Sequence, residues 1–434
     1  MNSNNTLPPV VVIRANDNCF LDVMRSLGQN NIPFVPVVFT WHGASAWISA
    51  KSRYFLDSVT ISNPADNEHL ALDGLLALGK KLVSQYKQKC ILLPTSDTIL
   101  MFIQYNFSSL SPYFLQMGPN NFETCCLDLI DKTRFAYMLE KSNIATPTSI
   151  SVECEADVPN AVDNISYPCI YKPSVKDLKN SFQTEHNGAK AIACADKETL
   201  KVALYRELKR GHKLIVQKKI NINSLEQEGS VYVYRDSLGN IRAVGGMRVL
   251  YRYPKNVGTG AILKPNADHA MYMLAIAATN ASNWCGFIGY EMMWDADIGG
   301  WTIIEANLRP WLSIRYQSVL GVDFIDLLYK DITNTLPPFE KTTHIKVQDI
   351  NYIGLTSAIV MFISELGDEK DGMLATLKYI NENIGKLFFA YGDPLDSAPG
   401  ACERELLYKR YPEHVETVDL IYNAMLNNNL CIVY

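Results

Sequence analysis

The sequence predicts a mixed fold of class α/β and α+β, with an N-terminal Rossmann-like parallel sheet followed by an α+β region and a mainly helical C-terminal segment. Strand and helix patterns alternate over the first 120 residues, short strands and a hairpin follow, and helical patterns dominate after about 340. A chain of 434 residues is too long for one ordinary core, so we expect two or three packed subdomains.

In the first region, buried strand patterns cover 8–15, 32–39 and 89–97, and helical spacing of apolar residues covers 16–31 and 73–86. Strands that alternate with helices of this length favour a parallel sheet. No G-x-G-x-x-G motif follows the first strand, so a dinucleotide site is not supported.

The pattern then changes. Residues 127–144 predict an amphipathic helix, and short strands follow at 146–152, 167–175 and 213–220. Two alternating runs in 230–254 predict a hairpin that turns at Leu238-Gly239-Asn240, because a glycine-containing turn separates them. A helix at 269–282 precedes strands at 286–295 and 301–307.

Composition excludes several classes of protein. The apolar fraction of 48% and charged fraction of 20% are ordinary for a soluble globular protein, and a net charge of −5 disfavours a nucleic-acid binder. Ten cysteines without C-x-x-C, and seven scattered histidines, favour free thiols in a reducing cytosol. Neither a signal peptide nor a membrane span is apparent, so we expect a cytoplasmic protein.

The stretch "TIIEANLRPWLSIR", residues 302–315, ends a β-branched strand with polar groups. Glu305, Asn307 and Arg309 are two apart and therefore face the same side of a strand. A buried carboxylate costs several kcal/mol unless it is paired or binds a metal. A structural Glu–Arg pair is the alternative to a functional site.

Glu291 precedes Glu305 by fourteen residues on a strand that is expected to pair with it. Two neighbouring carboxylates repel unless a divalent cation lies between them, and Mg²⁺ commonly binds one or two carboxylates plus substrate phosphates. Asn307 adds an amide oxygen of the same parity. Exposed acids on strand faces are the alternative, which the apolar flanking residues disfavour.

Lys132 begins a helix pattern, and Lys172 ends a strand forty residues later. Each lysine alone is most simply a solvated charge, but together with the downstream acids they predict a polyphosphate clamp. The polar segment 173–188 after Lys172 is long enough to close over phosphates and exclude water.

The order of these motifs resembles the ATP-grasp superfamily of carboxylate ligases: Lys132, "YPCIYKP", "LIVQKKI", Glu291 and "IIEANLRP". Other stretches resemble its carboxylate–amine ligase subgroup, which includes D-aspartate ligase-like proteins: "SAKSRYF", "ILLPTSDTIL", "DKTRFAYMLEKSNIATPT", "YRYPKNVGTGA" and "AYGDPLDSAP". The resemblance spans about 10–395. It implies a pre-ATP-grasp Rossmann-like domain (1–120), a lobe with clamp lysines and hinge (121–225), a lobe with the metal and substrate site (226–340), and a helical C-terminal segment (341–434).

The resemblance also implies roles for individual residues. Lys132 and Lys172 would contact ATP, and Glu226 or Glu228 the ribose. The adenine would meet the hinge residues Gln217, Lys218, Lys219 and Ile220, and magnesium would be held by Glu291, Glu305 and Asn307. The segment after Lys172 departs from a glycine-rich flap because it has a single glycine, so its phosphate contacts would come from Ser181, Lys176 or Lys179.

Four arginines are assigned to the reacting groups. Arg309 and Arg248 are expected to act in catalysis, with Arg309 facing the transferred phosphate or an acylphosphate. Arg252 and Arg315 are expected to bind substrate. Arg248 and Arg252 are four apart on an extended segment, which predicts a like orientation. A surface salt bridge is the alternative for Arg315.

The activity implied is an ATP- and Mg²⁺-dependent ligase that activates a carboxylate as an acylphosphate and joins it to an amine, releasing ADP and phosphate. Its partners would be small carboxylate and amine substrates, such as amino acids or peptides, and the oligomeric state, a homodimer included, is left open. A kinase or carboxylase-type activator on the same scaffold, and a non-catalytic ATP-binding protein, are the alternatives.

Overall fold

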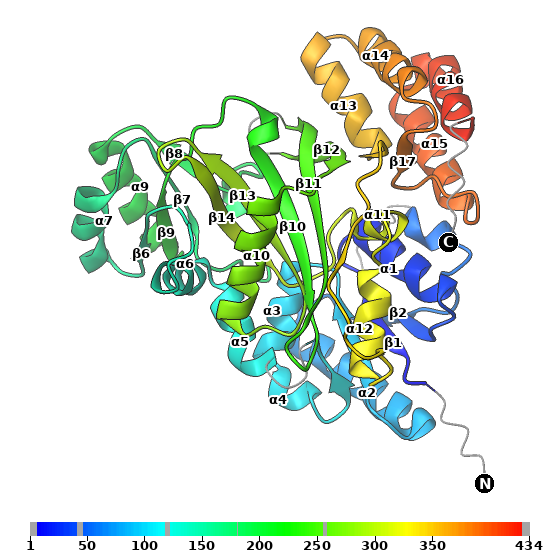
Figure 1. Ribbon diagram of the computed structural model, residues 1–434, viewed down its shortest axis with the longest axis horizontal. Helices are drawn as coiled ribbons and strands as arrows, with labels where there is room; N and C mark the ends of the chain where they lie inside the picture. The colour runs from blue at the N-terminus through cyan, green and yellow to red at the C-terminus, as the bar shows by residue number, and fades with distance from the viewer. Residues whose placement is uncertain (1–6, 41–46, 118–121, 180, 255–257, 428–434) are drawn as a thin grey trace.

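The structure, a computed structural model, describes residues 7–40, 47–117, 122–179, 181–254 and 258–427. Three sheets organise these residues, and helices surround them (Figure 1). Apolar side chains of the N-terminal sheet and of the largest sheet share one buried cluster, whereas the smallest sheet has a core of its own.

The N-terminal sheet has five strands in the order β3-β2-β1-β4-β5, all parallel, as predicted. The strands are β1 (Val10–Ile13), β2 (Phe34–Phe39), β3 (Val59–Ile61), β4 (Cys90–Pro94) and β5 (Phe114–Leu115). Its helical segments are α1 (Asp17–Gln29), η1 (Ser49–Lys51), α2 (Glu68–Tyr86), α3 (Asp97–Tyr105) and α4 (Phe107–Leu110). The strand order reverses between β1 and β4, so the loops after these two strands open at a topological switch point, where α/β sheets bind ligands.

The four-stranded sheet has the order β6-β9-β7-β8, and its pairs are antiparallel. Its elements are β6 (Ser149–Val152), η2 (Glu155–Asp157), α7 (Val158–Asn164), β7 (Cys169–Pro173), α8 (Ser181–Glu185), β8 (Ile192–Cys194), α9 (Lys197–Lys209) and β9 (Leu214–Lys218).

The single helix predicted for 127–144 is wrong, because the structure divides this region into α5 (Phe122–Ile130) and α6 (Lys132–Lys141). Asp131 separates them, since its carboxylate accepts hydrogen bonds from the N–H groups of Thr133 and Arg134 at the start of α6. Asp131 is thus an N-cap, and a new helix begins at Lys132.

The largest sheet has the order β14-β13-β10-β11-β12-β16-β17, and β15 pairs with β11. Its strands are β10 (Glu228–Arg235), β11 (Ile241–Tyr253), β12 (Thr259–Pro265), β13 (Gly286–Asp295), β14 (Gly300–Asn307), β15 (Thr343–His344), β16 (Asn351–Ile353) and β17 (Leu387–Phe389), and η3 (Leu225–Gln227) precedes β10. The predicted hairpin of β10 and β11 is confirmed; Gly239 adopts φ +91° in its turn, where a residue without Cβ is favoured. Helix α10 (His269–Ser282) crosses one face of this sheet (Figure 1).

The C-terminal region is mainly helical, as predicted. After α11 (Ile314–Val319) and α12 (Phe324–Ile332) come α13 (Leu355–Leu366), α14 (Glu369–Glu382), α15 (Ala398–Arg410), η4 (Pro412–His414) and α16 (Val415–Leu426). This region also adds β16 and β17 to the edge of the largest sheet, so it is joined to the preceding lobe. The domain limits placed at 120, 225 and 340 stay predictions.

Across the described ranges, no helix is both long and apolar enough to cross a membrane. The cysteines described there are all free thiols, and most of them are buried. The cytoplasmic location stays a prediction.

Candidate active site

Two carboxylates lie side by side on the largest sheet. Glu291 on β13 and Glu305 on β14 are direct antiparallel partners, and Gly289 pairs with Asn307 two rows along. The amide Nδ2 of Asn307 lies 3.4 Å from Oε1 of Glu291. The register shifts just beyond Glu291, at Met292, and such irregularities re-aim side chains near active sites. The predicted pairing of the two acids is therefore confirmed as geometry.

Both predicted clamp lysines lie beside these acids. The Nζ atom of Lys132 is 3.7 Å from Oε1 of Glu305, and the Lys132 N–H donates to the Ser174 carbonyl at 2.9 Å. Lys172 is buried at the end of β7. Burial lowers the pKa of Lys172 to about 8, although Glu305 and Glu291 act in the opposite direction. The structure thus brings both lysines to the two acids, as expected from the sequence.

The carboxyl group of Glu305 is held as an anion. Burial alone would raise its pKa, but the ammonium groups of Lys132, Lys176 and Lys172 outweigh burial and lower the pKa to about 2. The acids and lysines therefore form a compact array of opposite charges, which suits the binding of a metal–polyphosphate.

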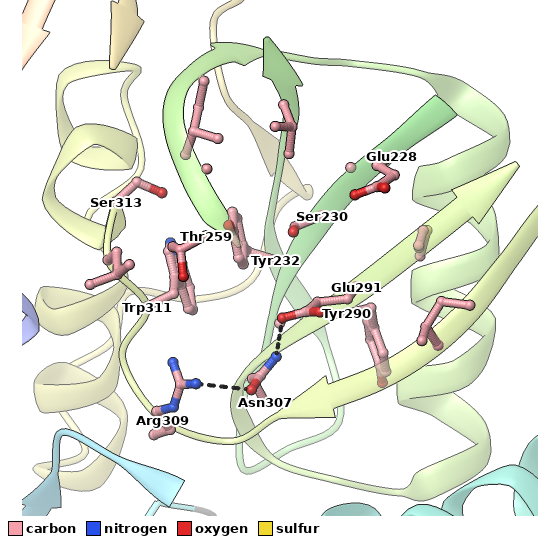
Figure 2. A pocket seen from close by; sticks show the side chains of 18 of the residues that line it. Glu228, Ser230, Tyr232, Thr259, Tyr290, Glu291, Asn307, Arg309, Trp311 and Ser313 are labelled. Carbon is pink, nitrogen blue, oxygen red and sulfur yellow. Dashed lines mark hydrogen bonds between the residues drawn. The ribbon is translucent and has the colours of Figure 1, made fainter. Parts of the chain in front are cut away.

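Arg309 extends from the end of β14 and contacts Asp97 of the N-terminal sheet. Its Nε lies 2.8 Å from Oδ1 and its Nη2 3.3 Å from Oδ2 of Asp97, and Nη2 also donates to Oδ1 of Asn307 at 3.2 Å (Figure 2 shows the Asn307 contact). Arg309 and Asn307 thus share one site, as their sequence parity predicts. Asp97 was missed from the sequence, although it lies in the polar turn after β4, at the ligand-binding edge of a parallel sheet.

Lys176 also contacts Asp97, with Nζ 2.7 Å from Oδ2. Three residues after Lys172 were predicted as candidates for phosphate contacts, and Lys176 is the one that lies beside the acids and lysines of the site. Lys179 is exposed. Ser181 begins α8, and its N–H donates to Asp177. Burial opposes ionisation of both Asp97 and Lys176, but their mutual attraction and Arg309 lower the pKa of Asp97, and Asp97 raises that of Lys176.

A cavity of about 340 Å³ opens between the largest sheet and the loops that follow β1 and β4. Figure 2 labels part of its lining: Glu228, Ser230, Tyr232, Thr259, Glu291, Asn307, Arg309, Trp311 and Ser313. The lining also includes Asn16, Cys19, Thr95, Ser96, Asp97 and Arg252. Glu305 does not line it; its carboxylate contacts Lys132 instead. The N-terminal sheet therefore supplies one wall of the site, although it has no dinucleotide motif.

One wall of the cavity is aromatic. The rings of Tyr232 and Trp311 stack with centroids 3.9 Å apart and planes 4° apart. A Cβ at Gly289 would lie 3.0 Å from the Tyr232 ring, so glycine leaves room for this stack beside Asn307. Burial raises the pKa of the Cys19 thiol in the same cavity to about 12, which keeps it protonated and a poor nucleophile.

Several polar groups of the predicted hinge residues already have partners within the protein. The N–H groups of Lys218 and Lys219 donate to the carbonyls of Thr148 and Pro168, and Lys218 Nζ pairs with Asp295 at 3.0 Å. Gln217 is buried and donates to Ser149 Oγ at 2.8 Å. Within the described part of the chain, the Ile220 N–H has no such backbone partner, so among the hinge N–H groups it is the donor left for adenine.

The two ribose candidates differ in position. Glu228 is buried, lines the cavity and pairs with Arg252. Glu226 is exposed and pairs with Lys264 at 2.6 Å. Glu228 and Ser230 are two apart on β10, and Ser230 is opposite Glu291, so Glu228 lies on the same face of the sheet as Glu291.

The like orientation predicted for Arg248 and Arg252 is wrong. Register shifts between Val249 and Tyr251, and between Tyr251 and Arg252, break the alternation that the prediction assumed. Arg252 lines the cavity. Arg248 instead reaches the start of α10, where its Nη2 is 2.8 Å from Asp268 Oδ2 and its guanidinium lies 4.8 Å from the centroid of Trp301. Its catalytic assignment has no geometric support.

Arg315 is neither at the surface nor at the cavity. Its side chain is 1% exposed and its Nη2 is 2.7 Å from Oδ2 of Asp393, which is 0% exposed. Asp393 also lies 3.8 Å from Arg25 of α1. The substrate-binding prediction and its alternative, a surface salt bridge, both require an accessible Arg315 side chain. Both are wrong, because Arg315 belongs to a buried ion pair between α11 and the 391–397 loop.

No family model matches the sequence. The chain is 23% identical over 345 residues to a D-aspartate ligase of Enterococcus faecium (strain Aus0004), a match that covers 77% of this chain and 80% of that protein. It is also similar to the structure of a biotin carboxylase from Campylobacter jejuni, with a TM-score of 0.58 and 16% identity, covering 79% of this chain and 74% of that chain.

The structure of an L-amino acid ligase from Bacillus licheniformis is similar as well, with a TM-score of 0.54 and 14% identity, covering 76% of each chain. These proteins have the ATP-grasp fold. The predicted fold and the resemblance drawn from the motifs are therefore confirmed.

Proposed function

We propose that this chain, which has the ATP-grasp fold, is an ATP-dependent, ADP-forming carboxylate–amine ligase. The observation that carries the proposal is the cross-strand pair of Glu291 and Glu305, with Lys132 at 3.7 Å from Glu305. A protein that only binds nucleotide has no need of two acids held side by side. The similarity to a D-aspartate ligase, which covers most of both chains, supports the same reaction class.

The acids fit a magnesium site. Residues directly opposite on antiparallel strands have Cβ atoms about 5 Å apart, so the carboxylates of Glu291 and Glu305 can share one cation. The Asn307 amide oxygen accepts from Arg309 and keeps a second lone pair for a metal. When bound, Mg²⁺ would neutralise phosphate oxygens and orient them, as in phosphoryl transfer generally.

The protein's own groups then position the nucleotide. In this proposal Lys132 and Lys172 bind the phosphates, the Ile220 backbone binds adenine, and Glu228 binds the ribose. Because Lys172 is buried among the acids, its charge is little screened by solvent. The site needs no covalent nucleophile, since positioning and charge neutralisation supply most of the catalysis.

The acid substrate is assigned to the cavity beside Arg309 and Asn307. Its carboxylate attacks the γ-phosphate of ATP, which gives an acylphosphate and ADP, and an amine then displaces phosphate to form an amide. Amino acids are the substrate class that we propose. The chain is similar in sequence to a D-aspartate ligase and in fold to an L-amino acid ligase.

The test is ADP release from MgATP with a panel of amino acids, supplied singly and in pairs. The proposal predicts release that needs an acid and an amine together, with an amide product. Release with an acid or bicarbonate alone and no amide would instead indicate the kinase or carboxylase-type activator. Nucleotide binding without ADP release under every condition would indicate a non-catalytic binder.

A further inference from the structure

Asp97 joins three separate parts of the chain through one carboxylate. It lies at the start of α3 in the N-terminal sheet, whereas Lys176 lies after β7 of the four-stranded sheet and Arg309 after β14 of the largest sheet. Oδ2 is 2.7 Å from Lys176 Nζ, and Oδ1 is 2.8 Å from Arg309 Nε. The three side chains are 21–24% exposed, so these contacts are partly shielded from solvent.

The contacts determine which edge of Arg309 faces a substrate. A guanidinium has five N–H donors. Here Nε donates to Asp97, Nη2 to Asp97 and Asn307, and Nη1 to the Pro310 carbonyl at 3.2 Å. Asp97 thus occupies the forked edge made by Nε and Nη2, and one N–H on Nη1 is left for a ligand. Arg309 is therefore fixed as a positive charge with one directed donor.

The same carboxylate holds the segment 173–179. This segment follows directly after the clamp residue Lys172, and Lys176 lies in its middle. The Ser174 carbonyl accepts from Lys132 N–H at 2.9 Å, which fixes the first residues of the segment. Its later part is held through Lys176 and Asp97. Lys176 of this segment and Arg309 thus share the Asp97 carboxylate as their ion-pair partner.

We propose that Asp97 is a positioning residue of the ligase reaction, which couples the placement of segment 173–179 over the nucleotide to the orientation of Arg309 at the acid. This inference rests on the proposed function for its catalytic meaning, but its geometry can be tested without turnover. Because Asp97 holds both cations, loss of its charge should release the segment and leave Arg309 free to turn.

The experiment is amide hydrogen exchange of segment 173–179 in the full chain, without ligand, for wild type, Asp97→Asn, Lys176→Met and the double variant. Each single variant should speed exchange about tenfold, as expected for losing a charge-assisted contact, and the double variant should add nothing, because both remove one interaction. Asp97→Glu, which keeps the charge, should restore protection. Asp326→Asn, which removes a comparable pair with Lys330 at 2.6 Å on α12, is the matched control and should leave the segment unchanged.

Unchanged exchange rates in both single variants would overturn the coupling. So would a double variant whose increase in exchange rate equals the two single increases combined, as for independent sites.

With an acid–amine pair that releases ADP, Asp97→Asn should also lower kcat and raise KM for the acid while the KM for ATP changes less than twofold. Equal changes in both KM values would reduce Asp97 to a structural role. If no pair releases ADP while the exchange result holds, the proposed function fails and the contact of Asp97 with the segment stands.

Discussion

Glu291 and Glu305 are direct cross-strand partners on β13 and β14, with the Asn307 amide 3.4 Å from Glu291. Two carboxylates in that relation repel each other in the absence of cations. Lys132 and Lys172 compensate part of this charge. The pair is therefore the feature on which the proposed magnesium site rests.

The first prediction concerns Glu305→Gln. The amide keeps the shape of the side chain but removes the charge, so MgATP should still bind while turnover falls by at least about a hundredfold. Single-turnover ADP formation measures this. Glu382→Gln, on an exposed residue of α14, is the control and should behave as wild type. Near-normal turnover of a folded Glu305→Gln protein would remove Glu305 from the metal site.

Lys172→Met should weaken MgADP binding about ten- to a hundredfold, because charge-assisted contacts to phosphate contribute about 1.5–3 kcal/mol. The thermal midpoint without ligand should change little, because removing a costly buried ammonium offsets the lost compensation of Glu291 and Glu305. Calorimetric titration and a melting curve test the two halves. Lys378→Met, on an exposed lysine, supplies the comparison, and an unchanged dissociation constant would exclude Lys172 from the clamp.

Glu226 and Glu228 form a matched pair of variants. Glu228 lines the cavity, whereas Glu226 is exposed and does not line it. We expect Glu228→Gln to raise the dissociation constant of MgADP about tenfold, the effect of weakening one hydrogen bond to a charged group, and Glu226→Gln to leave it within about twofold. The reverse order of effects would transfer the ribose contact to Glu226.

Arg309→Lys keeps the charge but loses the fork that holds Asp97 and Asn307 together. The rate of acylphosphate formation should fall at least about tenfold, with a smaller change in the KM for ATP. Hydroxylamine, which traps acylphosphates as hydroxamates, gives the rate, and Arg134→Lys at an exposed pair with Asp128 is the control. A change confined to the KM for ATP would assign Arg309 to the nucleotide.

Arg315→Met should act on stability. It would leave Asp393 as a fully buried carboxylate without the contact at 2.7 Å, and breaking such a pair typically costs about 3–5 kcal/mol of unfolding free energy. Urea unfolding measures the loss, and a second change, Asp393→Leu, should recover part of it. A raised KM for the acid with unchanged stability would return Arg315 to the substrate site.

The sequence predicted those parts of the site that depend on strand alternation. Glu305 and Asn307 share a face because they lie two apart in the regular end of β14, and Glu291 meets Glu305 because a short hairpin joins their strands. Arg309 lies beyond the strand and reaches the same site through its contact with Asn307. Where alternation fails, the prediction fails: two register shifts in β11 separate Arg248 from Arg252. A single sequence carries no signal for where such shifts fall.

Long-range contacts were the other missing information. Asp97 is 79 residues from Lys176 and 212 residues from Arg309, so no local pattern links them. Arg315 was placed by its nearness to Asn307 in the chain, but α11 begins at Ile314 and turns the side chain toward Asp393. The parallel N-terminal sheet, by contrast, followed from local patterns alone.

The most direct measurement of the proposed chemistry follows oxygen from the acid. An amino acid whose reacting carboxylate carries ¹⁸O is incubated with MgATP and an amine partner that supports ADP release, and the phosphate and amide are analysed by mass spectrometry. Ligation through an acylphosphate predicts one ¹⁸O atom in each phosphate released and the other in the amide. Phosphate that carries no ¹⁸O, released alongside ADP, would contradict activation of the carboxylate and with it the assignment of this chain as a carboxylate–amine ligase.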